Sequence, residues 1–329
     1  MGDGRPLGAV TGMRILITGG FGFVGGRLVE HLSLSGHQIL IASRQRQEVL
    51  DLLPMAVTVQ TDWDDENALE QICCGVDVVI HAAGMNAKEC ASRPPEALMV
   101  NGVATARLVE AAGRAGVQSF CYLSTAHVYA SPLVGIITEE SYPRNLHPYA
   151  TSHLAGEQAV LHAAEQGRVR GLVLRLSNAF GSPVRRDANC WTLLVNDLCR
   201  QAVETRKLVL KTSGLQQRDF IDLSSVCRIV EHTALEKGAR ETSGILNIGS
   251  GVSQSVLDMA NLIRQRCTRV LGFEPLLERW PNVPHKRHLP LEYRIERLAS
   301  LGLKPLPEGL TNEIDHLLSY CQSIFTYTD

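Results

Sequence analysis

The sequence predicts an α/β fold of the Rossmann type, a doubly wound parallel sheet with a smaller mixed C-terminal region. Two observations predict it: short apolar runs alternate with helix-like stretches in the first half of the chain, and a glycine cluster follows the first run. Strands of a parallel sheet are covered on both faces, so they are apolar nearly throughout. Alternation at this spacing gives a parallel sheet with right-handed crossovers.

The elements are expected in the following order. Apolar, β-branched runs place strands at residues 14–18, 38–42, 57–60, 76–81, 119–124 and 172–176. Helical periodicity, such as Val24, Leu28 and Leu32 at intervals of four, places helices after the first strand and at residues 97–112 and 149–165. Later helix candidates are residues 192–204, 225–237, 255–267 and 293–301.

The 329 residues divide into three expected parts. Residues 1–12 have no apolar signal core and are expected to be a flexible leader. Residues 13–177 are expected to form a dinucleotide-binding Rossmann domain. In residues 178–329 turn residues become more frequent, so this part is expected to be mostly a substrate-binding region, with some segments returning to the sheet.

Composition narrows the function classes. The formal net charge of -2 at pH 7 points to neither nucleic acid nor an anionic membrane, and no apolar run approaches the roughly 20 residues that cross a bilayer. The nine cysteines are odd in number and none falls in a CxxC pair. This pattern favours reduced thiols in a cytoplasmic protein and no metal site.

The glycine cluster lies in "ILITGGFGFVGG", between a strand and a helix of one βαβ unit. Glycine permits positive φ and close backbone approach, and the N–H groups at the helix N-terminus can bind a pyrophosphate. We therefore expect a dinucleotide to contact Gly19, Gly22, Phe23, Val24 and Gly25. A purely structural turn is the alternative.

The ends of the second and third strands bear on the choice of coenzyme. The second strand is followed by Ser43, Arg44 and Arg46, with no acidic residue at the end of the strand. A carboxylate there binds the ribose of NAD, whereas a hydroxyl and a guanidinium suit a 2′-phosphate. NADP(H) is favoured, with NAD, or solvated surface arginines, as alternatives. Asp62, followed by Trp63, either accepts from the adenine amino group or caps a helix that starts two residues later.

Five motifs in order carry a family resemblance: "TGGFGFVG", "VDVVIHAAG", "LSTAHVY", "YATSH" and "RDFIDL". From about residue 13 to about residue 310 the chain resembles the extended short-chain dehydrogenase/reductases. It resembles most closely their nucleotide-sugar branch of epimerases, dehydratases and reductases. The resemblance implies an NAD(P)-dependent enzyme acting on a nucleotide-linked sugar, and a homodimer that pairs through the helices at residues 97–112 and 149–165.

The resemblance also implies residue roles. Tyr149 is the catalytic acid/base, and Thr125 binds the substrate oxygen with Ser124 beside it. Asn178 contacts the phosphate region of the nucleotide sugar, and Arg218 clamps its diphosphate, a task that suits a bidentate guanidinium. A surface ion pair between Arg218 and the following aspartate is the alternative. The coenzyme wall behind the fourth strand is implied to be His81, Ala82, Ala83 and Gly84.

The chain departs from the family pattern Tyr-x-x-x-Lys, because His153 follows Tyr149 at that spacing. A lysine ammonium helps to ionise a tyrosine, whose reference pKa is about 10. Histidine, with a reference pKa near 6.5, is mostly neutral at pH 7. His153 is therefore a working substitute, or it marks a member that binds coenzyme without turnover, or another basic group replaces the lysine. A surface histidine of no consequence is a further interpretation.

The segment after Thr125 narrows the range of possible reactions. Dehydratases and decarboxylases of this branch need a carboxylate there, where this chain has Ala126 and His127. Reduction of a 4-keto sugar and C4 epimerisation remain. Reduction starts from the neutral phenol of Tyr149, which favours a 4-keto reductase. A C4 epimerase and a non-catalytic cofactor-binding regulatory protein are the alternatives.

Overall fold

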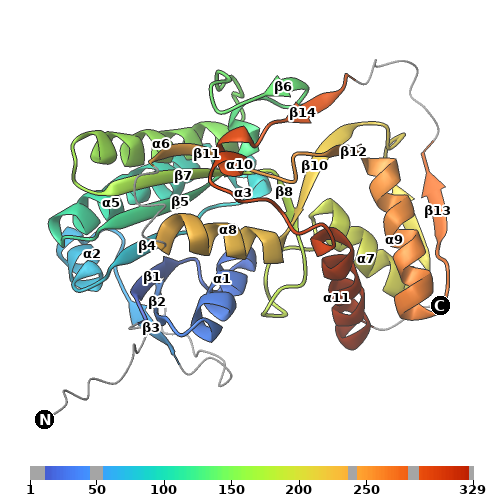
Figure 1. Ribbon diagram of the computed structural model, residues 1–329, viewed down its shortest axis with the longest axis horizontal. Coiled ribbons are helices and arrows are strands. Elements are labelled where there is room, and N and C mark those ends of the chain that lie inside the picture. Colours follow the sequence, from blue (N-terminus) through green and yellow to red (C-terminus); the bar gives the residue numbers. More distant parts are fainter. Residues whose placement is uncertain (1–11, 45–54, 236–242, 281–288, 326–329) are drawn as a thin grey trace, which may run out of the picture.

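A computed structural model describes residues 12–44, 55–235, 243–280 and 289–325. Its centre is a parallel sheet of seven strands in the order β11-β7-β5-β4-β1-β2-β3 (Figure 1). These strands are β1 (Arg14–Thr18), β2 (Gln38–Ser43), β3 (Ala56–Gln60), β4 (Val78–His81), β5 (Ser119–Thr125), β7 (Arg170–Leu176) and β11 (Gly244–Ile248). The predicted Rossmann fold is confirmed. The strand order reverses between β1 and β4, the place where such sheets bind ligands.

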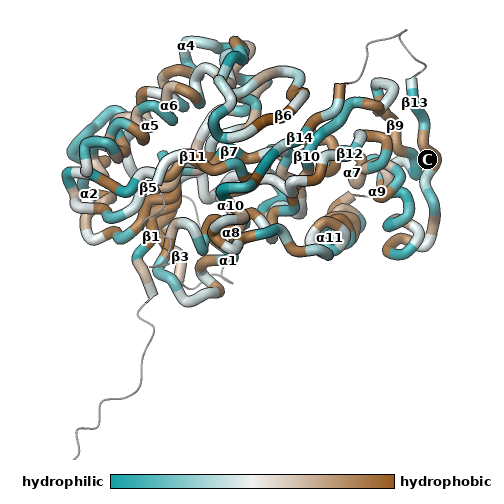
Figure 2. The backbone as a smooth tube through the Cα atoms, turned by 45° about the horizontal axis from the view of Figure 1, so that its top comes forward, coloured by the Kyte–Doolittle hydropathy of each residue, from teal (hydrophilic) through white to brown (hydrophobic). Residues whose placement is uncertain are grey.

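Helices cover both faces of the sheet. The helical elements that surround the sheet are α1 (Phe23–Leu34), α2 (Glu66–Cys73), α3 (Ala87–Ser92), α4 (Pro94–Ala97), η1 (Leu98–Val103), α5 (Ala104–Arg114), η2 (Ala126–Val128), α6 (Pro148–Glu165), α8 (Leu223–Leu235) and α10 (Glu296–Ser300). Successive strand residues face opposite sides, so Ile15 and Ile17 pack with α1 and α8, whereas Leu16 packs with α2, α5 and α6. Hydrophobic residues concentrate along these strands (Figure 2).

A second apolar core organises the C-terminal region. It lies among α7 (Leu194–Thr205), α9 (Val256–Leu271) and α11 (Gly309–Ile324). The small sheets here are β12-β10-β8, β13-β9 and β14-β6. Their strands are β6 (Gly135–Ile137), β8 (Asn178–Phe180), β9 (Lys207–Leu210), β10 (Gln217–Asp222), β12 (Ser253–Ser255), β13 (Leu276–Arg279) and β14 (Leu291–Tyr293). Because β10 is antiparallel to β12 and parallel to β8, the region is mixed as expected.

Two expected helices differ from the structure. The helix expected at residues 293–301 is wrong at its start, because Tyr293 ends β14 and α10 begins only at Glu296. Tyr293 pairs with Ile137 of the strand at residues 135–137, and its buried side chain donates its hydroxyl to the carbonyl of Arg175 at 2.7 Å. The helix expected at residues 97–112 is helical throughout, but its residues Leu98–Val103 form the π-helical turn η1 between α4 and α5.

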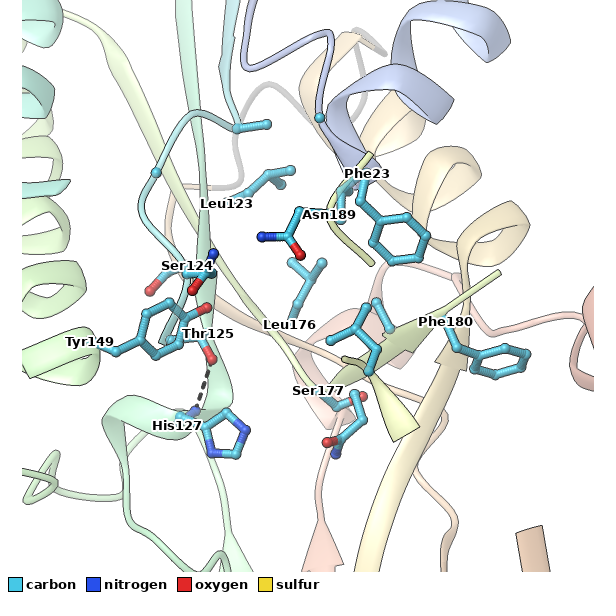
Figure 3. Close-up of a pocket in the computed structure, with 18 of the residues that line it drawn as sticks. Phe23, Leu123, Ser124, Thr125, His127, Tyr149, Leu176, Ser177, Phe180 and Asn189 are labelled. Atoms are coloured by element: carbon cyan, nitrogen blue, oxygen red, sulfur yellow. Dashed lines mark hydrogen bonds between the residues drawn. The ribbon is translucent and has the colours of Figure 1, made fainter. Parts of the chain in front are cut away.

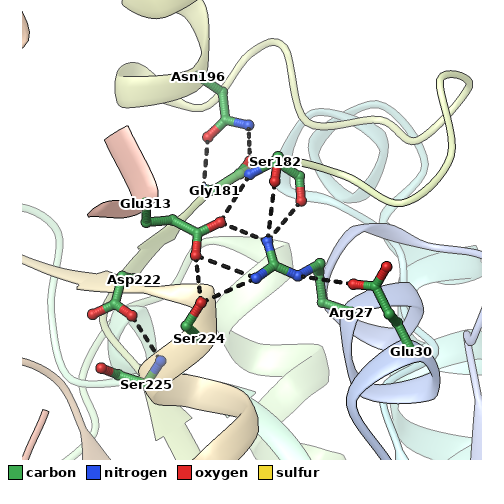
Figure 4. Close-up of polar contacts among 9 residues, drawn as sticks. All are labelled: Arg27, Glu30, Gly181, Ser182, Asn196, Asp222, Ser224, Ser225 and Glu313. Carbon is green, nitrogen blue, oxygen red and sulfur yellow. Dashed lines mark hydrogen bonds and ion pairs between the residues drawn. The ribbon is translucent and has the colours of Figure 1, made fainter. Parts of the chain in front are cut away.

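One polar cluster joins the two halves of the molecule (Figure 4). Arg27 of α1 donates to both carboxylate oxygens of Glu313 of α11, at 2.5 and 3.2 Å. The Ser224 hydroxyl and the Ser182 backbone N–H also donate to this carboxylate, at 2.6 and 3.1 Å. The Glu313 side chain is only 1% exposed. We call these four residues the Arg27–Glu313 cluster.

Among the described residues, no helix is long and apolar enough to cross a membrane, and no group of three or more potential metal ligands occurs. All nine cysteines are free thiols, and only Cys74 is exposed. Residues 1–11 of the expected leader and Arg46 lie outside those ranges.

Candidate active site

The glycine turn joins β1 to α1 with little space around its backbone. Gly19 has φ +69°, and a Cβ on Gly25 would lie 2.2 Å from the Gly19 carbonyl oxygen. Helix α1 begins after Gly22 with no side-chain cap and no acid in its first turn. Its first N–H groups are therefore free to receive an anion. The turn fits the pyrophosphate of a dinucleotide.

This turn opens into a cleft of about 580 Å³ at the carboxyl edge of the sheet (Figure 3). Its walls come from the first helix, the ends of several sheet strands, the start of α6 and segments of the C-terminal region. Most of the expected site residues line it, namely Gly19, Gly22, Phe23, Val24, Gly25, Ala82, Ala83, Gly84, Ser124, Thr125, Tyr149, His153, Asn178 and Arg218. Residues from distant parts of the sequence thus share one cleft.

Tyr149 and Thr125 bring two hydroxyl groups to the same wall of the cleft (Figure 3). Thr125 ends β5 and accepts the backbone N–H of His127 at 3.1 Å, which starts the turn η2. Burial raises the pKa of the Tyr149 phenol, and a hydrogen bond with Thr125 offsets part of that rise. Tyr149 is therefore protonated at neutral pH and can act as a proton donor.

His153 lies one helical turn after Tyr149, with the two ring centroids 4.6 Å apart and edge to face. Its side chain is 6% exposed, and its Nδ1 lies 2.8 Å from the hydroxyl oxygen of Tyr122. The interpretation as a surface histidine is wrong. Burial lowers the pKa of His153 to about 4, so the imidazole is neutral at pH 7. It adds no positive charge beside Tyr149.

Ser124 differs from its neighbour Thr125 in what its hydroxyl contacts. The Ser124 hydroxyl donates to Glu157 at 2.5 Å. Glu157 forms a buried ion pair with Arg175, and their side chains are 0% and 2% exposed. The Ser124 hydroxyl is thus held by this ion pair, and Thr125 supplies the hydroxyl beside Tyr149.

Arg218 and Asn178 lie on another wall of the cleft, on neighbouring strands. Asn178 donates to the carbonyl of Asp219 at 2.8 Å. The Asp219 carboxylate accepts from Ser177 and Ser250, so the proposed ion pair between Arg218 and Asp219 is wrong. Among the residues with described positions, none pairs with the Arg218 guanidinium, and burial lowers its pKa. This wall suits an anionic group.

A comparison with protein families matches the part of the chain that supplies most of these cleft residues. The sequence model of the NAD dependent epimerase/dehydratase family matches residues 15–249, from the first strand of the sheet to beyond Arg218. The chain belongs to the NAD dependent epimerase/dehydratase family.

Individual relatives agree with this family. The chain is 28% identical to dTDP-D-glucose 4,6-dehydratase of Mus musculus, over 89% of this chain and 84% of the relative. It is also 28% identical to dTDP-6-deoxy-L-talose 4-dehydrogenase (NAD(P)(+)) of Kitasatospora kifunensis, over 76% and 78% of the two chains. The structure of MoeE5 in complex with UDP-glucose and NAD matches with a TM-score of 0.73 and 26% identity, covering 92% of this chain and 98% of that one. The expected class, a nicotinamide-dependent enzyme of the nucleotide-sugar branch, is confirmed.

Besides His81, four described residues expected to bind coenzyme do not line the cleft: Ser43, Arg44, Asp62 and Trp63. They follow or end β2 and β3 at the same edge of the sheet. The interpretation of Asp62 as a helix cap is wrong. Helix α2 begins at Glu66, and the Asp65 side chain caps it by accepting two backbone N–H groups.

His81 is the one expected wall residue that the fold turns away from the cleft. It is 1% exposed, with Nδ1 2.6 Å from the Thr18 hydroxyl and Nε2 2.8 Å from the Thr105 hydroxyl. Burial lowers its pKa to about 3, so it stays neutral. The chain leaves the sheet only after His81, which is why the next three residues, and not His81, reach the cleft.

Other cleft residues were not predicted as ligands from the sequence. The His127 imidazole extends into the cleft (Figure 3), where partial desolvation and the charge of Arg218 lower its pKa although the residue is exposed. Glu89 comes from the short helix α3, and Asn189 from an irregular stretch before α7. The motif of Thr125 placed His127 near the site, but no periodic signal in the sequence identifies Asn189.

Proposed function

We propose that the protein uses NADP(H) to reduce the C4 ketone of a nucleotide-linked sugar. The observation that supports this most directly is the protonated Tyr149 phenol beside the Thr125 hydroxyl. The glycine turn and the Arg218 guanidinium lie in the same cleft and suit the two phosphate-bearing molecules that such a reaction brings together.

The chemistry divides between coenzyme and protein. A bound nicotinamide coenzyme supplies the hydride that goes to C4. Tyr149 donates its proton to the ketone oxygen, which becomes a hydroxyl group, and the resulting phenolate regains a proton from solvent. Thr125 donates a hydrogen bond that orients the same oxygen. Because burial raises the pKa of Tyr149, its resting form is the acid that reduction needs.

The cleft offers little for dehydration. Elimination needs a group that moves a proton next to the reacting carbon. At the two positions after Thr125, where a carboxylate would be needed, this chain has the buried Ala126 and the imidazole of His127. Glu89 is the one acidic side chain in the described cleft lining, and its carboxylate accepts the backbone N–H of Asn86 in a capping box. These features favour reduction over the activity named for the mouse relative.

The coenzyme preference is proposed from the end of β2. Ser43 and Arg44 offer a hydroxyl and a guanidinium, and neither is a carboxylate that would repel a 2′-phosphate. A C4 epimerase that retains NAD is the second candidate, because it would use the same Tyr149 and because MoeE5 is described with NAD. A cofactor-binding protein without turnover is the third, motivated by His153.

We also propose a cytoplasmic homodimer. Leu98, Met99 and Val103 are between 37% and 49% exposed on η1, which continues directly into α5. A second copy packed on α5 and α6 would cover this apolar surface.

The proposal is tested with purified protein, NADPH or NADH, and 4-keto-6-deoxyglucose linked to UDP or dTDP. We expect NADPH to be consumed with formation of the 4-hydroxy sugar, at least ~10-fold more efficiently than NADH, as loss of a charge-assisted phosphate contact implies. Formation of a C4 epimer of UDP-glucose without net coenzyme consumption would favour the epimerase. Binding of NADPH without any conversion would favour the non-catalytic protein.

Arg218→Gln is expected to raise KM for the nucleotide sugar by about 10- to 100-fold. Hydrogen bonds to charged groups contribute about 1.5–3 kcal/mol, and each 1.4 kcal/mol is a tenfold change in affinity. The change in kcat should be smaller, because the reacting hydroxyls remain. Steady-state kinetics with varied sugar, and coenzyme titration as a separate measurement, separate the two effects.

Arg269→Gln is the matched control, since it removes the same charge from an exposed position on α9. It should leave KM unchanged. Arg218→Lys should recover part of the affinity, because it keeps the charge but not the bidentate geometry. A KM for Arg218→Gln within about twofold of the original would remove Arg218 from the diphosphate site.

A further inference from the structure

His153 stands where the family pattern has a lysine, and its two ring nitrogens have different surroundings. Nδ1 lies 2.8 Å from the hydroxyl oxygen of Tyr122, a fully buried residue of β5. Nε2 makes no hydrogen bond to any residue whose position is described, and the side chain lines the cleft. A neutral imidazole donates from one nitrogen and accepts at the other. The position of its proton therefore decides what His153 offers to a ligand.

Hydrogen bonds on the far side of Tyr122 fix the protons of its neighbours. Thr18 Oγ1 accepts a backbone N–H at 3.1 Å, so its own proton is available to His81 Nδ1. The Thr105 hydroxyl donates to the Asn101 carbonyl at 2.7 Å, so its oxygen accepts from His81 Nε2. His81 stacks on Tyr122 with ring centroids 5.4 Å apart. Its one ring proton lies on the bond to Thr105, so His81 has no proton to donate to the Tyr122 hydroxyl.

The Tyr122 hydroxyl has one proton and three acceptors within reach. The Thr105 hydroxyl oxygen also interacts with Tyr122, but it already accepts the ring proton of His81. The Asn101 carbonyl is 3.5 Å away and already accepts the Thr105 hydroxyl, whereas His153 Nδ1 is 2.8 Å away. Hydrogen bonds of normal strength are shorter than about 3.2 Å, so the proton belongs on the bond to Nδ1. Burial holds the pKa of Tyr122 well above its usual value, so the phenol keeps this proton at neutral pH.

We propose that Tyr122 is a positioning residue that holds His153 as the Nε2–H tautomer, so that His153 presents a neutral N–H donor to an oxygen atom in the cleft. The catalytic use of this donor rests on the proposed function, but the tautomer does not. A neutral donor keeps the hydrogen-bonding ability of an ammonium group without its charge. The Tyr149 phenol then stays protonated, in agreement with its role as an acid.

The tautomer can be measured by nitrogen-15 NMR of the whole chain labelled at histidine, without substrate or coenzyme. The His153 signals are assigned by their absence from His153→Gln. We expect the proton of His153 on Nε2 in the unmodified protein. In Tyr122→Phe the donor to Nδ1 is gone, so the Nδ1–H tautomer should become populated.

Tyr129→Phe is the matched control for Tyr122→Phe. It also removes a buried phenol hydroxyl, but one that donates to Asn247 at 2.7 Å. We expect it to leave the His153 signals unchanged. A proton on Nδ1 in the unmodified protein overturns the proposal, and this measurement stands even where Tyr122→Phe does not fold. A folded Tyr122→Phe protein with unchanged His153 signals overturns it as well.

Turnover gives a second readout. In His153→Gln the amide N–H lies near the position of Nε2, whereas in His153→Asn it lies near that of Nδ1. We expect His153→Gln to retain at least ~10-fold more NADPH-dependent reductase activity than His153→Asn, the effect of about one charge-assisted hydrogen bond. The reverse order, or an equal loss, contradicts the proposal. A protein with the expected tautomer but no reduction of any keto sugar would instead contradict the proposed function.

Discussion

Tyr149→Phe is expected to lower kcat for keto-sugar reduction by about 10²- to 10⁴-fold, the usual contribution of a positioned acid. Phenylalanine keeps the ring and its edge-to-face contact with His153, but it has no proton for the ketone oxygen. KM for the sugar and the affinity for coenzyme should change by less than about threefold, because the packing of the ring is kept. Steady-state kinetics and coenzyme titration measure the two effects separately.

Tyr142→Phe is the control for this result, because Tyr142 is 86% exposed in the segment that precedes α6. It should keep full activity. If Tyr149→Phe keeps kcat within about threefold of the original, Tyr149 is not the proton donor and the proposed mechanism is wrong. An equal loss in both variants would point to a general effect of removing a phenol.

The sheet and the assembly of the site could be predicted because each depends on a local pattern. The run at residues 14–18 presents apolar side chains to both faces of the sheet, as a covered strand requires, and β1 has the same bounds in the structure. The motifs of Gly19, Thr125 and Tyr149 lie far apart in sequence. They meet because the carboxyl ends of parallel strands share one edge of the sheet.

What could not be predicted depends on the direction of single side chains. Ser124 and Thr125 are adjacent, but one hydroxyl contacts a buried glutamate and the other faces Tyr149. His81 ends β4 and faces the core, although its motif assigns it to the coenzyme wall. Tyr122 lies in an apolar run and gives no sign of a contact with His153, because that contact joins a strand to a helix 31 residues later.

The Arg27–Glu313 cluster is a second determinant that only the structure reveals, and its loss should be costly for stability. Arg27→Met is expected to lower the free energy of unfolding by about 3–5 kcal/mol at pH 7, because it leaves a buried carboxylate without its counter-charge. Burial alone would raise the pKa of Glu313, but the hydrogen bond and charge of Arg27, together with hydrogen bonds from Ser224 and Ser182, keep the pKa below its ordinary value. Urea denaturation followed by circular dichroism measures the change.

The sign of the pH dependence separates this explanation from a loss of packing. A carboxyl group with a lowered pKa stabilises the fold above its unfolded pKa, and the contribution is lost as the pH falls through the folded value. In Arg27→Met the buried Glu313 can instead protonate, so the difference from the original protein should shrink between pH 7 and pH 5. Arg93→Met breaks an exposed ion pair with Glu96 and should cost less than about 1 kcal/mol. A cost for Arg27→Met that is equally small, or that is the same at both pH values, would show that the buried charge pair does not hold α1 to α11.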